Sequence, residues 1–232
     1  MMRPILRVGF ACGVLLFTRA VCSGPMAAQQ GATLVGKVSL IDRGDQPAED
    51  LAQAVVWVDS GSVEAPRPAR ADMATQDKQF VPRVVVVAVG STVTFPNHDG
   101  FKHNVFSLSE ARPFDLGLYG RGEGKSVEFP EAGIIRVYCN VHASMSGFVV
   151  ITDSPWFAQA AGDGTFLIKD VPPGTYRLHA WHERAKEIVT IDVTVPPQGI
   201  TGLTVTLDAS GYKFKAHLNK YGQPYTTQGR RY

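Results

Sequence analysis

Residues 134–145 read I-I-R-V-Y-C-N-V-H-A-S-M and join a strand-like pattern to a group of potential metal ligands. Ile135, Val137 and Cys139 fall on one face of an extended chain, and the residues between them fall on the other. This alternation predicts a strand that ends at Cys139 with the thiol directed toward a core. A thiol, an imidazole and a thioether then follow one another at the spacing C-x-x-H-x-x-M.

The rest of the chain carries further signs of β-structure. Hydrophobic residues make up 44% of the 232 residues and charged residues 19%, which suits a globular core. Long amphipathic helical patterns are missing, so we expect an all-β fold. Ser60–Arg70 reads as a linker and Ser109–Lys125 as a long loop. The strand candidates are Thr33–Ile41, Ala54–Val58, Val84–Val89, Thr92–Phe95, His103–Ser107, Ser126–Phe129, Ile134–Cys139, Gly147–Thr152, Thr165–Ile168, Thr175–Trp181, Ile188–Val195 and Thr201–Leu207.

Residues 1–28 have the order of a secretory signal peptide. A basic start, M-M-R-P-I-L-R, precedes an apolar run and then a small-residue exit between Cys22 and Ala28. The apolar run is about ten residues long, short of the roughly 20 that a spanning helix needs, so a cleaved signal is favoured over a membrane anchor. Lipidation of Cys22 is disfavoured because Arg19 is a poor match to an apolar lipobox. We therefore expect a periplasmic or secreted protein without a membrane span.

Loss of this segment changes the charge and the cysteine content. The formal net charge falls from +2 to −1, because Arg3, Arg7 and Arg19 are removed. Of the three cysteines only Cys139 remains, so no internal disulfide can form. A lone thiol in an oxidising compartment is a liability unless it is buried or ligated. Metal ligation would explain how this thiol survives export.

The residue types around Cys139 fit copper best. Type 1 copper takes a thiolate, two imidazoles and a weak axial thioether. Cys139, His142 and Met145 supply three of these ligands, and the candidate for the fourth is His103 in F-K-H-N-V-F-S. Zinc is disfavoured because a thioether is a poor zinc ligand. A dinuclear copper centre would need a second cysteine.

Alternative interpretations of the same residues remain open. Met145 could be core filler, Cys139 an inert buried thiol and His103 a structural histidine. Cys139 could also be a nucleophile activated by a histidine, although no orienting acid or oxyanion hole can be identified. His98 is expected on a surface loop. The remaining histidines outside this block are His179, His182 and His217.

The block from about Met73 to Asp153 resembles the cupredoxins, the plastocyanin, amicyanin and pseudoazurin group of blue copper proteins. The resemblance rests on V-V-V-V-A-V-G-S-T-V-T-F-P-N-H-D, on H-N-V-F-S and on G-I-I-R-V-Y-C-N-V-H-A-S-M-S-G. The short C-x-x-H-x-x-M loop is most similar to that of amicyanin. F-D-L-G-L-Y and M-A-T-Q-D-K-Q-F resemble bacterial proteins described as methylamine-utilisation or plastocyanin-like.

This resemblance implies a cupredoxin Greek-key β-sandwich at residues 70–153 and a set of site residues. One copper would be held by His103, Cys139, His142 and Met145, and Asn104 would hydrogen-bond toward the thiolate. The implied function is single-electron transfer through the exposed edge of His142, without enzymatic bond chemistry. The implied partner is a redox protein such as a c-type cytochrome or a periplasmic dehydrogenase. The alternative is a copper-binding cell-envelope scaffold or a carbohydrate-binding protein without an electron-transfer role.

A second module is expected around the first. G-D-G-T-F-L-I-K-D-V-P-P-G-T-Y-R-L-H-A-W-H-E resembles the second half of a carboxypeptidase regulatory-like domain, a small transthyretin-type β-sandwich. The resemblance implies a module made of residues 33–60 and 160–208, with the cupredoxin inserted between its halves. The alternative is that Thr33–Val58 forms the first strands of the cupredoxin.

The C-terminal segment, residues 209–232, is a basic tail. It has five lysines and arginines and no acidic residue, and it lacks strand periodicity, so we expect it to be extended or disordered. Because it carries +5 beside a body of −6, it could fold back on that body, steer an acidic partner or remain solvated.

Overall fold

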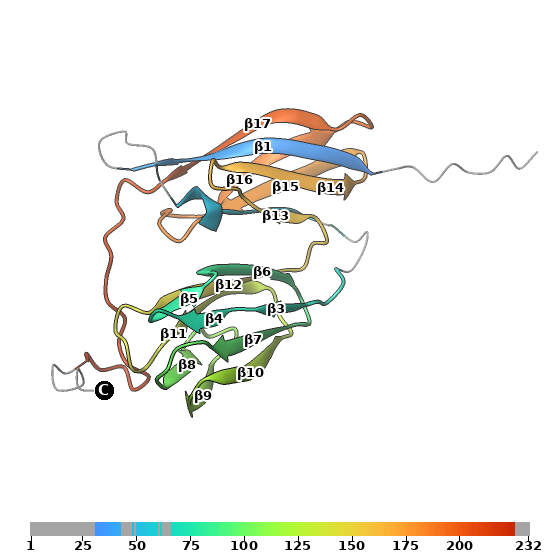
Figure 1. Ribbon diagram of the computed structural model, residues 1–232. Coiled ribbons are helices and arrows are strands. Elements are labelled where there is room, and N and C mark those ends of the chain that lie inside the picture. The colour runs from blue at the N-terminus through green and yellow to red at the C-terminus, as the bar shows by residue number, and fades with distance from the viewer. Residues whose placement is uncertain (1–30, 43–47, 49, 60, 62–65, 226–232) are drawn as a thin grey trace, which may run out of the picture.

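The computed structural model describes residues 31–42, 48, 50–59, 61 and 66–225. They form two β-sandwiches, which lie one above the other in Figure 1. The predicted all-β fold is confirmed. The predicted signal peptide, residues 1–28, and the tail beyond Tyr225 lie outside the described residues.

The flanking sandwich, the upper body in Figure 1, has sheets of order β14-β1-β17 and β13-β2-β15-β16. Its strands are β1 (Ala32–Ile41), β2 (Val55–Val58), β13 (Phe157–Gln159), β14 (Thr165–Val171), β15 (Gly174–Trp181), β16 (Val189–Val195) and β17 (Ile200–Asp208). A 3-10 turn, η1 (Leu51–Gln53), precedes β2. Among the described residues, no helix has the length and apolar character needed to cross a membrane.

The central sandwich has sheets of order β10-β7-β4-β5, with β3 paired to β7, and β6-β12-β11-β8-β9. Its strands are β3 (Arg70–Asp72), β4 (Ala74–Gln76), β5 (Gln79–Val81), β6 (Val84–Ala88), β7 (Ser91–Asn97), β8 (His103–Ser107), β9 (Phe114–Tyr119), β10 (Gly122–Phe129), β11 (Gly133–Tyr138) and β12 (Ser146–Thr152).

The flanking sandwich is assembled from the two ends of the chain. Strand β1 pairs with β14 and β17, and β2 pairs with β13 and β15, so strands that precede the central block join strands that follow it. Trp57 of β2 lies opposite Phe157 of β13, which places the entry and exit of the central block side by side. This pairing corresponds to the insertion arrangement. The boundaries 33–60, 70–153, 160–208 and 209–232 stay predictions.

Alternation along β11 positions the thiol. Ile135, Val137 and Cys139 are buried, whereas Arg136 is exposed, as the sequence pattern predicts. Burying an aliphatic side chain of this size stabilises a fold by about 1.5–3 kcal/mol. The alternating pattern therefore fixes which face of β11 enters the core, and Cys139 follows on that same face.

The expected long loop Ser109–Lys125 is wrong from Phe114 onward. Strand β9 and the beginning of β10 lie there, and β9 pairs antiparallel with β8. β9 is the outermost strand of its sheet, so it has a partner on one side only and needs no buried alternating face. Asp115 and Gly117, which looked like loop residues, are accommodated in that edge strand, where the Asp115 side chain accepts a hydrogen bond from the Gly117 amide.

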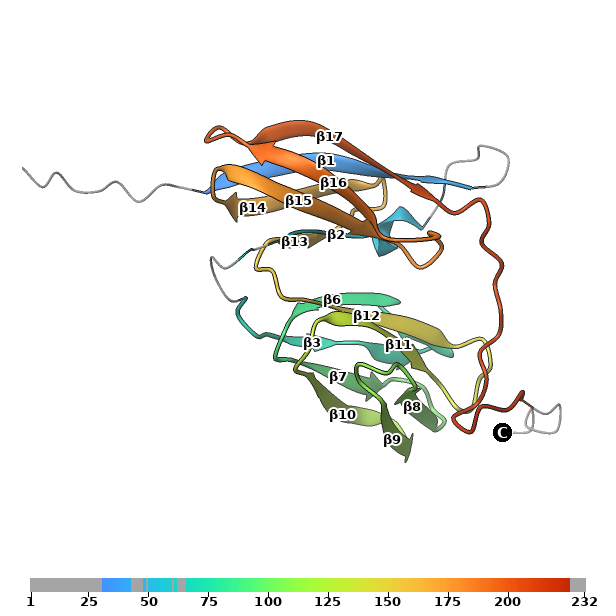
Figure 2. The same cartoon turned by 180° about the vertical axis from the view of Figure 1, so that it is seen from behind.

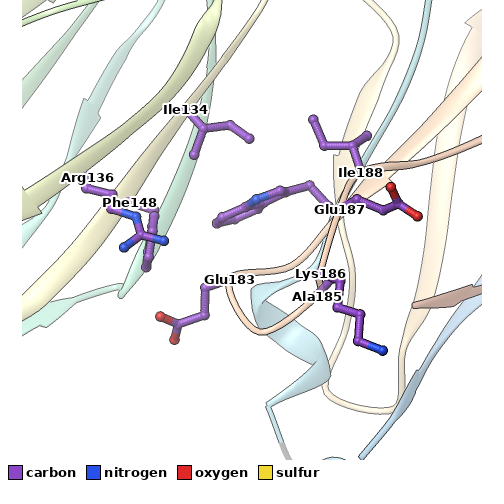
Figure 3. A pocket seen from close by; sticks show the side chains of 9 residues that line it. Ile134, Arg136, Phe148, Glu183, Ala185, Lys186, Glu187 and Ile188 are labelled. Carbon is purple, nitrogen blue, oxygen red and sulfur yellow. The ribbon is translucent and has the colours of Figure 1, made fainter. Parts of the chain in front are cut away.

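The two sandwiches meet through a small apolar cluster and an ion pair. Val55 and Trp181 of the flanking sandwich pack with Phe148 of the central one. Beside them, Arg83 donates two hydrogen bonds to the Glu183 carboxylate at 2.6 and 2.8 Å. A cavity of about 220 Å³ opens at this junction, with Ile134, Arg136 and Phe148 on one side and the segment Glu183–Ile188 on the other (Figure 3). The ion pair and the tilted rings of Phe148 and Trp181, whose centroids are 5.2 Å apart, join the two bodies at this edge.

Candidate metal centre

Cys139, His142 and Met145 lie on one tight loop at the end of β11. The Cys139 amide donates to the Met145 carbonyl at 3.1 Å, and the Met145 amide donates to the His142 carbonyl at 3.0 Å. These two bonds close the loop before β12 begins at Ser146. Met145 and Cys139 are both buried in the core of the central sandwich. The spacing C-x-x-H-x-x-M is therefore long enough for one turn and brings its three side chains to one end of the sandwich.

His103, at the beginning of the neighbouring strand β8, meets this loop. Its Nδ1 atom lies 3.5 Å from the Cys139 sulfur, and Nδ1 of His142 lies 3.6 Å from the same sulfur. The three potential ligand atoms all lie within 4.8 Å of one another. His103 and Cys139 are fully buried, whereas His142 is partly exposed. Thus three of the four residues singled out from the sequence have donor atoms that converge on one point.

The separations leave room for one first-row metal ion. A metal about 2.3 Å from a thiolate and about 2.0 Å from an imidazole nitrogen holds these two atoms about 3.5–3.7 Å apart, at angles between tetrahedral and trigonal. The two sulfur–nitrogen separations of 3.5 and 3.6 Å lie in that range. A soft sulfur between two imidazoles is a donor set typical of copper.

Local hydrogen bonds act on the thiol. Burial raises the pKa of Cys139, and the amides of Asn104, Val141 and His142 oppose this effect by donating to the sulfur. The Val141 amide lies 3.5 Å from it. Burial also lowers the pKa of His142, and the neighbouring His103 adds to that effect. A neutral His142 ring keeps a lone pair available for a metal.

A carboxylate that the sequence reasoning missed orients His103. Nε2 of His103 lies 2.7 Å from Oδ2 of Asp99, which is itself buried. Burial acts to raise the pKa of Asp99, but hydrogen bonds from His103 and from the Lys78 and Asp77 amides outweigh it and lower that pKa. An ionised Asp99 fixes a proton on Nε2 and leaves Nδ1 free to face the sulfur.

Asn104 approaches the thiol through its backbone. Its amide donates to the Cys139 sulfur, whereas its side-chain amide donates to Oδ1 of Asp115 at 2.6 Å. The side-chain oxygen of Asn104 is buried without a hydrogen-bond partner. The Asn104 side chain therefore joins strand β8 to strand β9 rather than to the ligand loop.

The remaining histidines divide into three kinds. His98 is exposed, as expected for a surface loop. His179 and His182 lie in the flanking sandwich, where they bond to Asp59 and to the carbonyl of Asp50. His217 was grouped with these as lying outside the block, yet the fold brings it onto the ligand loop, with Nε2 3.3 Å from the His142 carbonyl.

Comparisons with known proteins identify a copper-binding family for the block that contains these residues. The family model "Copper binding proteins, plastocyanin/azurin family" matches residues 69–152. A chloroplast plastocyanin of Physcomitrium patens is 34% identical over 84 residues, 32% of this chain and 50% of that protein. A plastocyanin of Ulva arasakii is 32% identical over 82 residues, 32% of this chain and 84% of that protein. A solved structure, a novel purple cupredoxin from Nitrosopumilus maritimus, is 24% identical and covers 35% of this chain and 99% of that chain, with a TM-score of 0.31.

The family match and the donor set together define a copper-binding β-sandwich protein, with copper as its cofactor. The chain belongs to the plastocyanin/azurin family. It spans between 50% and 58% of the length of the first three chloroplast plastocyanins that it matches. The matched block coincides with the central sandwich, and the flanking sandwich lies outside the matched residues.

Proposed function

We propose that the protein is an exported type 1 copper protein that carries single electrons between redox partners. The observation that supports this most directly is the convergence of His103, Cys139 and His142 within 4.8 Å on a closed, mostly buried loop. We assign these three residues and Met145 as the copper ligands. Copper held in this way would alternate between Cu(I) and Cu(II), since sulfur ligands favour the first state and imidazoles accept the second.

The surroundings of the ligands favour electron transfer over bond chemistry. Cys139 and His103 are fully buried, so a substrate has no direct access to them. Backbone bonds fix the loop from Cys139 to Met145, and Asp99 fixes His103. Because these ligands are held in place by the protein, they need little rearrangement when the charge of a bound metal changes. The protein in this proposal is not an enzyme.

His142 provides the path to the surface. Its ring is partly exposed, and the ring of Phe101, which is 39% exposed, lies 5.7 Å away. An exposed apolar ring beside a partly exposed ligand suits brief docking of a partner over a small interface. We propose that this partner is a c-type cytochrome or a periplasmic dehydrogenase.

The flanking sandwich, residues 33–60 and 160–208, is proposed to be a carboxypeptidase regulatory-like module that holds the copper block. Its support is the pairing of strands from both sides of the central block and the turn pattern G-D-G…V-P-P-G. The ligand loop is proposed to be of the amicyanin type, because of its C-x-x-H-x-x-M spacing. The proposed location is the periplasm or the exterior, after cleavage of residues 1–28.

The test is titration of the purified protein with Cu(II). We expect an intense blue colour at one equivalent, which arises from thiolate-to-copper charge transfer, and loss of that colour in Cys139→Ser. His98→Gln, which replaces an exposed histidine of the same block, is the matched control and should keep the colour. A colourless copper complex, or one that Cys139→Ser leaves unchanged, would contradict the ligand assignment.

A second measurement separates an electron carrier from a copper-binding scaffold. A carrier should give a reversible voltammetric wave and exchange electrons rapidly with a c-type cytochrome. A blue protein that is electrochemically irreversible and inert toward redox partners would instead support the scaffold. A thiol enzyme would be inhibited by copper rather than completed by it.

A further inference from the structure

The C-terminal segment leaves the flanking sandwich and runs to the central one. In Figures 1 and 2 the chain after β17 descends along one edge of the molecule and reaches the lower body. It has no regular secondary structure between Tyr212 and Tyr225. Although they form no helix or strand, residues 217–225 make specific contacts with the ligand loop, and we call this segment the strap.

A tight turn shapes the strap. The Asn219 side chain accepts hydrogen bonds from the amides of Tyr221 and Gln223, and the Asn219 amide donates to the Gln223 carbonyl at 2.8 Å. Gly222 occupies the left-handed region at φ 74°, which glycine adopts without steric cost. Because the chain reverses here, His217 on one side of the turn and Tyr225 on the other both reach the same loop.

Three polar contacts join the strap to the ligand loop. The Tyr225 hydroxyl donates to the Cys139 carbonyl at 2.7 Å. The Lys220 amide donates to Oδ1 of Asn140 at 2.9 Å. Nε2 of His217 lies 3.3 Å from the His142 carbonyl. The strap thus bonds to the backbone of both Cys139 and His142 and to the side chain between them.

A fourth contact reaches the strand that carries His103. Nζ of Lys220 lies 2.6 Å from Oδ2 of Asp115. Oδ1 of the same carboxylate accepts from the side chain of Asn104, the residue after His103. Asp115 therefore links the strap to the second ligand-bearing element of the site.

Stacked rings support these polar contacts. The ring of His217 stacks on Tyr138 with centroids 4.4 Å apart, and Tyr225 meets His217 edge-on at 5.3 Å. Tyr138 immediately precedes Cys139 in the chain. Aromatic pairs of this kind stabilise packing beyond the area they bury. The backbone around Cys139 is consequently held by ring packing on one side and by hydrogen bonds on the other.

From these contacts we infer that His217, Lys220 and Tyr225 are positioning residues of the copper site. They touch no ligand atom. They fix the backbone from which Cys139 and His142 project, and thereby the distance and orientation of the sulfur and imidazole donors. This inference rests on the proposed copper ligation, and it assigns to the C-terminal segment a role in setting the properties of the metal.

The experiment compares a chain that ends at Tyr212 and the point variants Tyr225→Phe and His217→Ala with the full-length protein. Tyr176→Phe is the matched control for the hydroxyl, because Tyr176 also donates to a backbone carbonyl, that of Pro172, in the flanking sandwich. Phe214→Ala controls for loss of an exposed ring in the same segment. The three readouts are the rate of copper release, the position of the charge-transfer band with the reduction potential, and amide exchange of residues 140–142 in the metal-free protein.

We expect the truncated chain to release copper about tenfold or more faster, as is typical for loss of an outer hydrogen-bond layer around a metal site. Tyr225→Phe should have a smaller effect, about twofold to tenfold. The band and the potential should shift, and exchange at 140–142 should accelerate, in these variants and not in Tyr176→Phe or Phe214→Ala. If the truncated chain does not fold, the point variants carry the test.

Unchanged spectrum, potential, copper release and amide exchange in Tyr225→Phe and His217→Ala would overturn the inference. Failure of the proposed function has a different signature, since the full-length protein would then bind no copper with a blue colour. Accelerated amide exchange in the metal-free variants would support the strap's role even in that case.

Discussion

Asp99 lies 2.7 Å from His103 through its Oδ2 and, through both carboxylate oxygens, also accepts the backbone amides of Asp77 and Lys78. These two residues form the two-residue turn between β4 and β5, and both have positive φ. A turn of this kind is the one that matches the twist of a hairpin. One buried carboxylate therefore couples the first histidine of the site to a hairpin on the opposite sheet.

We predict that Asp99→Ala lowers copper affinity by about 10- to 100-fold, the range found when the hydrogen-bond partner of a metal-bound histidine is lost. The His103 ring would lose the acceptor that holds its Nε2 proton. Competition titration with a chelator measures the effect. Asp99→Asn, which keeps one oxygen acceptor, should lose less affinity, and His98→Gln should lose none. Equal affinity in Asp99→Ala and the natural chain would refute the role of Asp99.

Docking at His142 gives a second prediction. Phe101→Lys places a charge beside the partly exposed ligand, and we expect reduction by the partner to slow by about fivefold or more, as for loss of an interface residue that contributes about 1 kcal/mol. The blue colour should stay, because the Phe101 ring packs against the His103 and His142 rings but is not a metal ligand. Stopped-flow mixing with a reduced cytochrome measures the rate. Leu167→Lys, at a site of comparable exposure on the flanking sandwich, is the control, and a similar loss of rate there would place docking elsewhere.

The ion pair between Arg83 and Glu183, which joins the two sandwiches, gives a third prediction. Arg83 bonds to Glu183 and also to the carbonyl of Ser146, the residue after Met145. Because the Glu183 side chain is only 8% exposed, Glu183→Ala should destabilise the protein by about 1–3 kcal/mol. For a chain of this length each kcal/mol lowers the melting temperature by about 2–4 °C. Calorimetry measures the change. Lys186→Ala, which breaks an exposed ion pair, should leave the melting temperature almost unaltered; a comparable drop would mean that burial is not the cause.

The fourth prediction concerns pH. Burial lowers the pKa of His182, whose neutral ring accepts a hydrogen bond from the Arg184 amide and faces the Asp50 carbonyl. The unfolded chain therefore binds a proton at a higher pH than the folded chain does, and the contribution of His182 to stability is present above pH 6.5 and declines as the pH falls below it. Denaturant unfolding between pH 7.5 and 5 should show this decline. The decline should be smaller in His182→Gln than in His98→Gln, and an identical pH profile in both would contradict the assignment.

The strands and the ligand loop were accessible from sequence for local reasons. Alternation along β11 needs only neighbouring residues to be recognised, and the buried pattern of Ile135, Val137 and Cys139 follows it. The residue types in C-x-x-H-x-x-M are those that bind copper, and His103 in H-N-V-F-S completes the predicted set of ligands. Whether Met145 binds the metal stays a prediction, because its burial is equally compatible with core packing.

The contacts that surround the site depend on tertiary structure and left no local signal. Asp99 sits in P-N-H-D, a sequence that reads as an ordinary turn, and its role appears only when β8 places His103 beside it. His217 and Tyr225 belong to a segment without periodicity, so nothing in the pattern indicated that a turn at Asn219 would bring both onto Cys139 and His142. The alternating pattern of a strand can be recognised from neighbouring residues, whereas the conformation of this segment depends on its contacts with the central sandwich.

The strand order also determines the order in which the two sandwiches can form during synthesis. Ser39 of β1 bonds to Thr206 of β17 across 167 residues, so the upper sandwich in Figure 1 cannot close until nearly the whole chain has been made. At a synthesis rate of about 5–20 residues per second, this delay is about 8–33 s. All strands of the central sandwich are complete at Thr152, whereas residues 217–225, which contact its ligand loop, are made later. Between the synthesis of Thr152 and that of residues 217–225, the ligand loop therefore lacks the contacts made by His217, Lys220 and Tyr225.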